Sequence, residues 1–179
     1  MTIADAQRHI RHTYVGGAPG VLVSALVWLV AAVVEARTDI ATGFTALFIG
    51  GMFIFPLSAA VAAIFYRHRG KAASNGLTGI ALESTIAMIG GLLAAWLFLR
   101  VGAPQLVMPV AAIAIGTHYF AFKTLYGDRV YWLLAAAITL AGLAGVFLGS
   151  ALPLGTAFTV ALIEAVFGVA MLLRAKPED

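Results

Sequence analysis

The sequence has no cysteine and few charged residues, and each shortage removes whole classes of protein. Without cysteine there is no disulfide, no thiolate metal site and no cysteine nucleophile. Charged residues make up 11% of the 179 residues, whereas a soluble domain carries about a quarter. Because 62% of the residues are hydrophobic, a soluble fold of this length has no room to hide the apolar surface. The composition therefore predicts an integral membrane protein.

The charges that remain are placed at the ends of apolar runs. A net charge of +3 could point to a nucleic-acid partner, but the basic residues flank the apolar runs and form no patch. We therefore expect no nucleic-acid partner, and the partner we expect is the lipid bilayer.

Six apolar runs are long enough to cross the hydrocarbon core, which takes about 20 residues of helix. Backbone groups in lipid must be hydrogen-bonded internally, so each run is expected to be helical. The predicted fold class is all-α, a polytopic bundle of six transmembrane helices over 17–174, with short cytoplasmic tails. We expect 1–16 to be an amphipathic or frayed tail and 175–179 to be the second tail. The expected spans are 17–35, 40–66, 77–99, 105–126, 130–149 and 153–173.

Basic residues set the expected orientation. Nine of the eleven fall on one side of the predicted bundle and two on the other. Lysine and arginine in short loops favour the cytoplasmic side, so both termini are expected to be cytoplasmic. The nine are Arg8, Arg11, Arg67, Arg69, Lys71, Lys123, Arg129, Arg174 and Lys176, and the two are Arg37 and Arg100.

Three ionisable residues lie too deep in the predicted spans to reach the interface easily: Glu83, His118 and Glu164. A charge near the bilayer centre costs about 2.5–3.5 kcal/mol on insertion scales, so such groups usually face the bundle interior. Each of the three also stands on a stripe of small residues at helical spacing, and small residues mark close helix contacts. We therefore expect all three to point inward, with Glu83 and His118 at similar depth and Glu164 slightly above.

These three residues are candidates for a proton or cation site. Burial favours the neutral form of a carboxyl group and of an imidazole, which allows both to change protonation near neutral pH. The alternative is that neutral Glu83 and Glu164 hydrogen-bond to neighbouring helices and set their register. The candidate hydrogen-bond partners are Ser58, Ser84, Thr85, Thr117 and Tyr119.

One histidine and two carboxylates could also hold an iron or manganese ion. The Glu-x-x-His pairs that di-iron bundles use are absent from the sequence, so we expect no metal and no cofactor.

Several glycines and one proline are expected to serve helix packing or bending. The pair Gly145 and Gly149 has the small-xxx-small spacing of a tight helix crossing. Two adjacent glycines followed by a proline could let the second span bend. The residues assigned to packing or hinges are Gly50, Gly51, Pro56, Gly90, Gly142, Gly145 and Gly149.

The stretch "GTHYFAFKTLYGDRVYW", residues 116–132, resembles a family of small bacterial multi-pass membrane proteins of unknown function. The shared features are Gly116, His118 and the pair Leu125 and Tyr126 before a further apolar run, and the resemblance extends back to the helix with Pro56. It implies a multi-pass protein of the bacterial cytoplasmic (inner) membrane and adds weight to His118, but it implies no activity.

Three functions remain open on this basis. The first is a small transporter or channel-like protein, in which intramembrane carboxylates and a histidine couple transport to protons. The second is a non-catalytic scaffold or accessory subunit, in which the acids only set helix register. The third is an intramembrane acid–base enzyme that uses Glu83 and His118 on a lipid-like substrate. Six short helices enclose little volume, so a homo-oligomer is expected, and the small-molecule or ion substrate stays unknown.

Overall fold

The computed structural model describes residues 2–65 and 75–175, and within them every regular element is helical. Six helices, α2 to α7, are long and apolar enough to cross a membrane, so the predicted fold class, an all-α protein with six long apolar helices, is confirmed. Position 66 and the basic residues Arg67, Arg69, Lys71 and Lys176 lie outside the described residues. The α-helices are α1 Ile3–Thr13, α2 Ala18–Arg37, α3 Ile40–Phe65, α4 Thr78–Arg100, α5 Val107–Tyr126, α6 Val130–Leu148 and α7 Gly155–Arg174.

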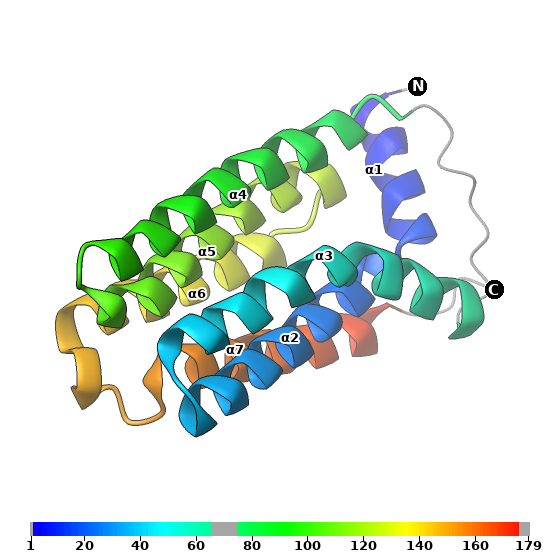
Figure 1. Cartoon of the computed structure of the whole chain (residues 1–179). Coiled ribbons are helices and arrows are strands. Elements are labelled where there is room, and N and C mark those ends of the chain that lie inside the picture. Colours follow the sequence, from blue (N-terminus) through cyan, green and yellow to red (C-terminus); the bar gives the residue numbers. More distant parts are fainter. Residues whose placement is uncertain (1, 66–74, 176–179) are drawn as a thin grey trace.

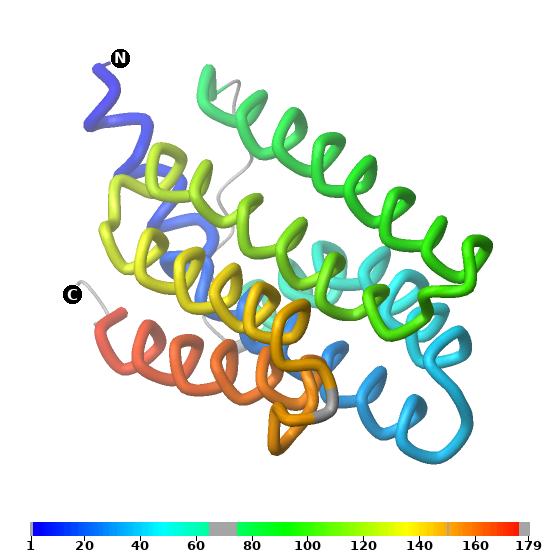
Figure 2. Tube along the Cα trace, turned by 90° about the vertical axis from the view of Figure 1, so that its left-hand side faces the viewer, coloured from blue at the N-terminus to red at the C-terminus, as the bar shows by residue number. Residues whose placement is uncertain are grey.

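The six long helices form an open ring. Neighbours around it follow the order α3, α2, α7, α6, α5 and α4, so the first and last long helices of the chain pack side by side. The two helices at the ends of this series, α3 and α4, barely touch each other (Figure 1). Most of the residues of α3 and α4 are exposed, because each has a packed neighbour on one side only. The ring of helices is therefore not closed by helix packing between α3 and α4 (Figure 2).

The short helix α1 crosses the end of the bundle at which α4 begins and α5 ends (Figure 1). Gln7 donates a hydrogen bond to the carbonyl of Thr124 at 2.8 Å, and Arg11 donates one to the carbonyl of Tyr126. Asn75, just before α4, donates to the carbonyl of Ala6 at 2.9 Å. These three contacts join α1 to α4 and α5 at this end of the ring.

A glycine turn makes this crossing possible. Val15, Gly16 and Gly17 have φ values of 52°, 62° and 81°, a left-handed conformation that glycine adopts readily. The Tyr131 hydroxyl donates a hydrogen bond of 2.7 Å to the carbonyl of Gly16. A Cβ on Gly17 would collide with the same hydroxyl and lie 3.0 Å from the ring of Tyr126. The chain can therefore turn sharply against α5 and α6 because the two glycines lack side chains.

Glycines also bring neighbouring helices close together. A Cβ on Gly142 would lie 2.7 Å from the carbonyl oxygen of Pro109, and one on Gly145 would lie 2.9 Å from the Pro109 ring. Gly149, expected to extend this contact, has nothing within 4 Å of an added Cβ and ends α6 with φ 53°. The tight crossing of α6 on α5 therefore uses Gly142 and Gly145.

On α3, the three residues expected to allow a bend behave differently from one another. Gly50 packs on α2, because a Cβ there would lie 2.7 Å from a methyl carbon of Val27. Gly51 faces open space. Pro56 lies inside α3, which bends in its second half, as an interior proline favours (Figure 1).

Candidate functional site

The open ring encloses a cavity of about 390 Å³, within the usual size range of small-molecule sites. Its walls come from α2, α3, α4 and α5, and α1 closes one end. Along α4 the lining runs from Thr78 to Leu92, which is about 20 Å at the rise of a helix. The cavity therefore extends from the α1 end of the bundle past the middle of α4, and it lies between α3 and α4, the two neighbours with the fewest mutual contacts.

Most of the lining is apolar, and its character changes along the axis. The deep part is bordered by Trp28, Leu47, Met88, Leu92 and Ile115. The part next to α1 is bordered mainly by aromatic rings, with hydroxyl groups from Ser24, Ser58, Thr78 and Thr85 along the walls. An occupant therefore meets an apolar surface at one end and aromatic and hydroxyl groups at the other.

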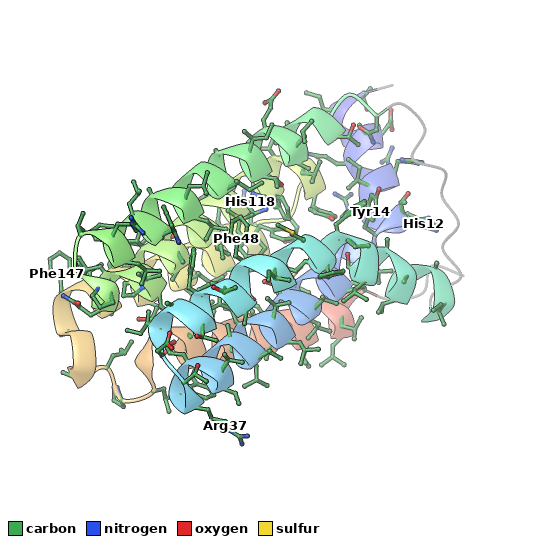
Figure 3. The ribbon with its side chains drawn as sticks, in the orientation of Figure 1. His12, Tyr14, Arg37, Phe48, His118 and Phe147 are labelled. Atoms are coloured by element: carbon green, nitrogen blue, oxygen red, sulfur yellow. The ribbon has the colours of Figure 1, made fainter. Side chains whose placement is uncertain are left out.

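His118 is the histidine of this lining. It stands on α5 and lies inside the bundle, between α4 and α3 (Figure 3). Its ring centroid is 4.5 Å from that of Phe122, in an edge-to-face arrangement. The ring is within hydrogen-bonding reach of the backbone carbonyl of Ser84 on α4, while its Nδ1 atom is buried without a partner among the described residues. One nitrogen of the ring thus lies near the backbone of α4, and the other makes no bond to the described part of the chain.

Glu164 lies behind the cavity wall and does not line it. It has no exposed surface, and its Oε1 atom accepts a hydrogen bond of 3.0 Å from the hydroxyl of Tyr119. The hydroxyl of Ser24 on α2 lies beside both groups, while Oε2 has no partner among the described residues. Since Tyr119 and Ser24 both line the cavity, they form the boundary between the cavity and the buried carboxyl group.

Glu83 does not point inward, and that expectation is wrong for the single chain. It is exposed on α4 and does not line the cavity. At about 100° per residue, Glu83 lies roughly opposite the cavity face of α4, which includes Ala81, Thr85 and Met88. Glu83 and His118 are at similar depth, since His118 approaches the carbonyl next to Glu83, but α4 lies between their side chains.

The candidate hydrogen-bond partners also behave differently from one another. Tyr119 binds a carboxyl group, whereas the other four hydroxyls donate to carbonyls of their own helices. Ser58 donates to Phe55 at 2.9 Å, Ser84 to Ala81 at 3.1 Å, Thr85 to Ala81 at 2.7 Å, and Thr117 to Ile113 at 2.9 Å. Such bonds satisfy a hydroxyl in lipid without joining two helices.

The structure thus brings together His118, Tyr119, Ser24 and Glu164, and leaves Glu83 apart. Within residues 2–65 and 75–175, no group of three His, Asp or Glu residues could hold a metal ion. Ser24 was missed by sequence reasoning, although it interrupts the apolar run "GVLVSALVWLV" of α2 as its one polar residue. The arrangement can bind a mainly apolar molecule and hold protons beside it on an imidazole, a phenol and a carboxyl group.

Comparisons with known proteins place the chain in a family. The family of unknown function DUF7010 matches residues 3–174, which covers α1 and all six long helices. No curated protein and no solved structure matches the chain. The match includes both the aromatic part of the cavity and the segment that closes it. The chain therefore belongs to the family of unknown function DUF7010.

Proposed function

We propose that the protein is a small membrane transporter and that the cavity is its substrate site. The substrate is a mainly apolar molecule that enters from the bilayer. The observation that carries this proposal is the cavity itself, a space of about 390 Å³ with mostly apolar walls inside a membrane-spanning bundle. A fully packed bundle without a cavity would instead favour the scaffold function, because it leaves no room for a ligand.

The weak contact between α3 and α4 supports entry from the lipid. These helices barely touch, and both line the cavity along one face. One end of the space is closed by α1 through Ile10, which is 2% exposed, and by Tyr14. A molecule that leaves toward the α1 end has to displace this helix, whereas one that arrives sideways has to part only α3 and α4.

In this proposal the groups that couple transport to protons are His118 and Glu164. Glu164 is linked to the cavity by the hydrogen bond that it accepts from the Tyr119 hydroxyl, and His118 lines the cavity directly. The Glu83 side chain does not reach the cavity, because it lies on the opposite face of α4. For the same reason the acid–base enzyme loses its expected pair, since Glu83 and His118 cannot act on one substrate atom inside the cavity.

We further propose that the chain lies in the inner membrane of a bacterium, with α1 on the cytoplasmic side. The support is the excess of lysine and arginine at the α1 end, which opposes transfer of that end across the membrane. On this orientation the aromatic part of the cavity lies in the cytoplasmic half of the bundle.

A homo-oligomer is also part of the proposal, and its support is the outer face of α4. A Cβ added to Gly90 on this face would have nothing within 4 Å, so no contact inside the described part of the chain requires glycine there. Ala87 and Ala94 continue the same exposed stripe around Glu83. Two copies in the same orientation, related by an axis along the membrane normal, would bring the two Glu83 carboxyl groups to the same depth.

Quenching of Trp28 fluorescence tests occupation of the cavity. Trp28 is fully buried and lines the cavity, whereas Trp96 and Trp132 are 44% and 48% exposed. In a Trp96→Phe/Trp132→Phe protein in nanodiscs, an uncharged single-chain alcohol with a brominated tail should quench Trp28 saturably.

Two neighbouring residues of α3 provide the blocked variant and its control. Gly51→Phe fills open space in the cavity and should abolish the saturable quenching. Met52→Phe adds a ring on the exposed side, where Met52 is 64% exposed, and should leave the quenching unchanged. Equal quenching in the two variants, or none in the unblocked protein, would remove the proposal.

A further inference from the structure

We infer that the substrate is an organic cation, an alkylated ammonium group with a single apolar tail, and that the ammonium binds in the aromatic part of the cavity. This inference rests on the proposed function, since it assumes that the cavity takes a ligand. It names the chemistry that the walls of the cavity recognise.

Six aromatic rings gather at the α1 end of the cavity and come from α3, from α5 and from the residue that follows α1. They belong to Tyr14, Phe55, His118, Tyr119, Phe122 and Tyr126. The centroid of Phe122 is 4.5 Å from that of His118, 5.6 Å from Tyr119 and 5.9 Å from Tyr126. Tyr14 and Phe55 form a second pair at 6.3 Å. Such rings present negative faces, and groups of them bind alkylated ammonium ions.

At the α1 end Arg11 donates a hydrogen bond to the carbonyl of Tyr126 but does not line the cavity, so the charges that act directly on a bound cation are those of the lining and of the groups behind it. No lysine or arginine belongs to the described lining of the cavity. The carboxyl group closest behind the wall is Glu164, which is fully buried and is bound by the Tyr119 hydroxyl. Its Oε2 atom has no partner among the described residues. An ionised Glu164 would thus have its negative charge balanced most directly by a cation on the other side of Tyr119.

An alkylated ammonium fits this site better than an inorganic ion or an anion. A small metal ion keeps its water unless oxygen or nitrogen ligands replace it, and the described residues hold no such group of three. An anion would face ring edges at best and would meet no lysine or arginine in the described lining. Alkyl groups on the nitrogen reduce hydration, so desolvation by ring faces costs little.

The rest of the cavity determines the tail. Beyond the rings lies an apolar surface that extends past the middle of α4 and is formed by Trp28, Leu47, Met88, Leu92 and Ile115. The total volume of about 390 Å³ suits one short chain and not both chains of a phospholipid. The ligand is therefore a single-tailed amphiphile with its positive end toward α1.

The test compares two probes that differ only in charge. The first is a bromododecyl trimethylammonium ion, and the second is its uncharged isostere, in which carbon replaces the nitrogen. Both are titrated against the Trp96→Phe/Trp132→Phe protein in nanodiscs of zwitterionic lipid, with concentrations given as mole fractions in the bilayer. Quenching that persists in the Gly51→Phe protein is subtracted as contact from the lipid.

We expect both probes to quench Trp28 saturably and the cation to bind at least tenfold more tightly. Loss of one desolvated ring contact weakens cation binding by roughly 30-fold. Phe122→Leu should cause a loss of this order for the cation alone. Phe55→Leu, at a ring that is 67% exposed and outside the core, should reduce cation binding without affecting folding.

The possible failures are distinct. If the uncharged probe binds as tightly as the cation, the cation inference is overturned while ligand binding in the cavity stands. If neither probe quenches saturably, the proposed function fails as well. If both leucine variants fold and bind the cation like the parent protein, the aromatic part is not the ammonium site.

Discussion

The bond between Tyr119 and Glu164 should be the main polar link between α5 and α7. Glu164 is fully buried and Tyr119 is 5% exposed, so neither group can turn to water when its partner is removed. Leaving a buried donor or acceptor without its partner costs about 1–3 kcal/mol. Bonds between helices in membranes average about 0.6 kcal/mol, with a maximum of about 1.7. We expect Tyr119→Phe to destabilise the protein by about 1–2 kcal/mol, the region in which these two ranges overlap.

A double-mutant cycle separates this bond from other effects of the substitutions. The variants are Tyr119→Phe, Glu164→Leu and the double substitution, with unfolding free energies measured by titration of mixed micelles with SDS and followed by circular dichroism. The coupling energy should be about 0.6–1.7 kcal/mol, and the double variant should lose less than the sum of the single ones. A coupling below about 0.3 kcal/mol, within the scatter of additive sites, would refute the bond.

Three further predictions concern other parts of the fold. Gly142→Val should destabilise the protein by about 1–3 kcal/mol through overpacking, while Gly90→Val, at an open position, should leave its unfolding free energy in detergent unchanged. A cysteine at Ala87, the protein's sole cysteine, should cross-link two copies in the membrane if α4 forms the oligomer contact, and a cysteine at exposed Leu140 on α6 should not. Hydrogen bonds from Thr2, the residue that caps the start of α1, hold the pKa of Asp5 below its ordinary value, so this cap should stabilise α1 above about pH 4 and be lost as the pH falls through the lowered pKa. Hydrogen exchange of α1 should show this loss at low pH in the wild type and already at neutral pH in Asp5→Asn.

The sequence predicted the six long helices because an apolar run in lipid has one stable backbone form. It also predicted that Glu164 points inward, since Ala157, Ala161 and Gly168 share its face and all four residues are buried. The local pattern is enough to predict these features, because the residues that share one face of a helix follow from the helical period alone.

The position of Glu83 could not be predicted in the same way. A stripe of small residues looks the same whether it meets a helix of its own bundle or faces outward. The difference depends on the order of helices around the ring, in which α4 is an end member. That order is a tertiary property that sequence spacing does not contain.

The cavity was missed for a related reason. Its walls come from five helices, and it exists because α3 and α4 are held apart while α1 crosses the end. The crossing depends on the left-handed turn at Gly16 and Gly17, for which the sequence "GG" is only a weak signal. Ser24 was the one available sign, as a lone hydroxyl in an apolar run.

If the cavity holds a molecule taken from the membrane, native mass spectrometry should detect that molecule on the purified protein. The protein, Gly51→Phe and Met52→Phe would be extracted in the same mild detergent, and small molecules bound to each would be compared. We predict a bound molecule in the protein and in Met52→Phe that is lost in Gly51→Phe. The same bound molecules in all three proteins, or none in any, would show that the cavity does not hold a ligand from the membrane.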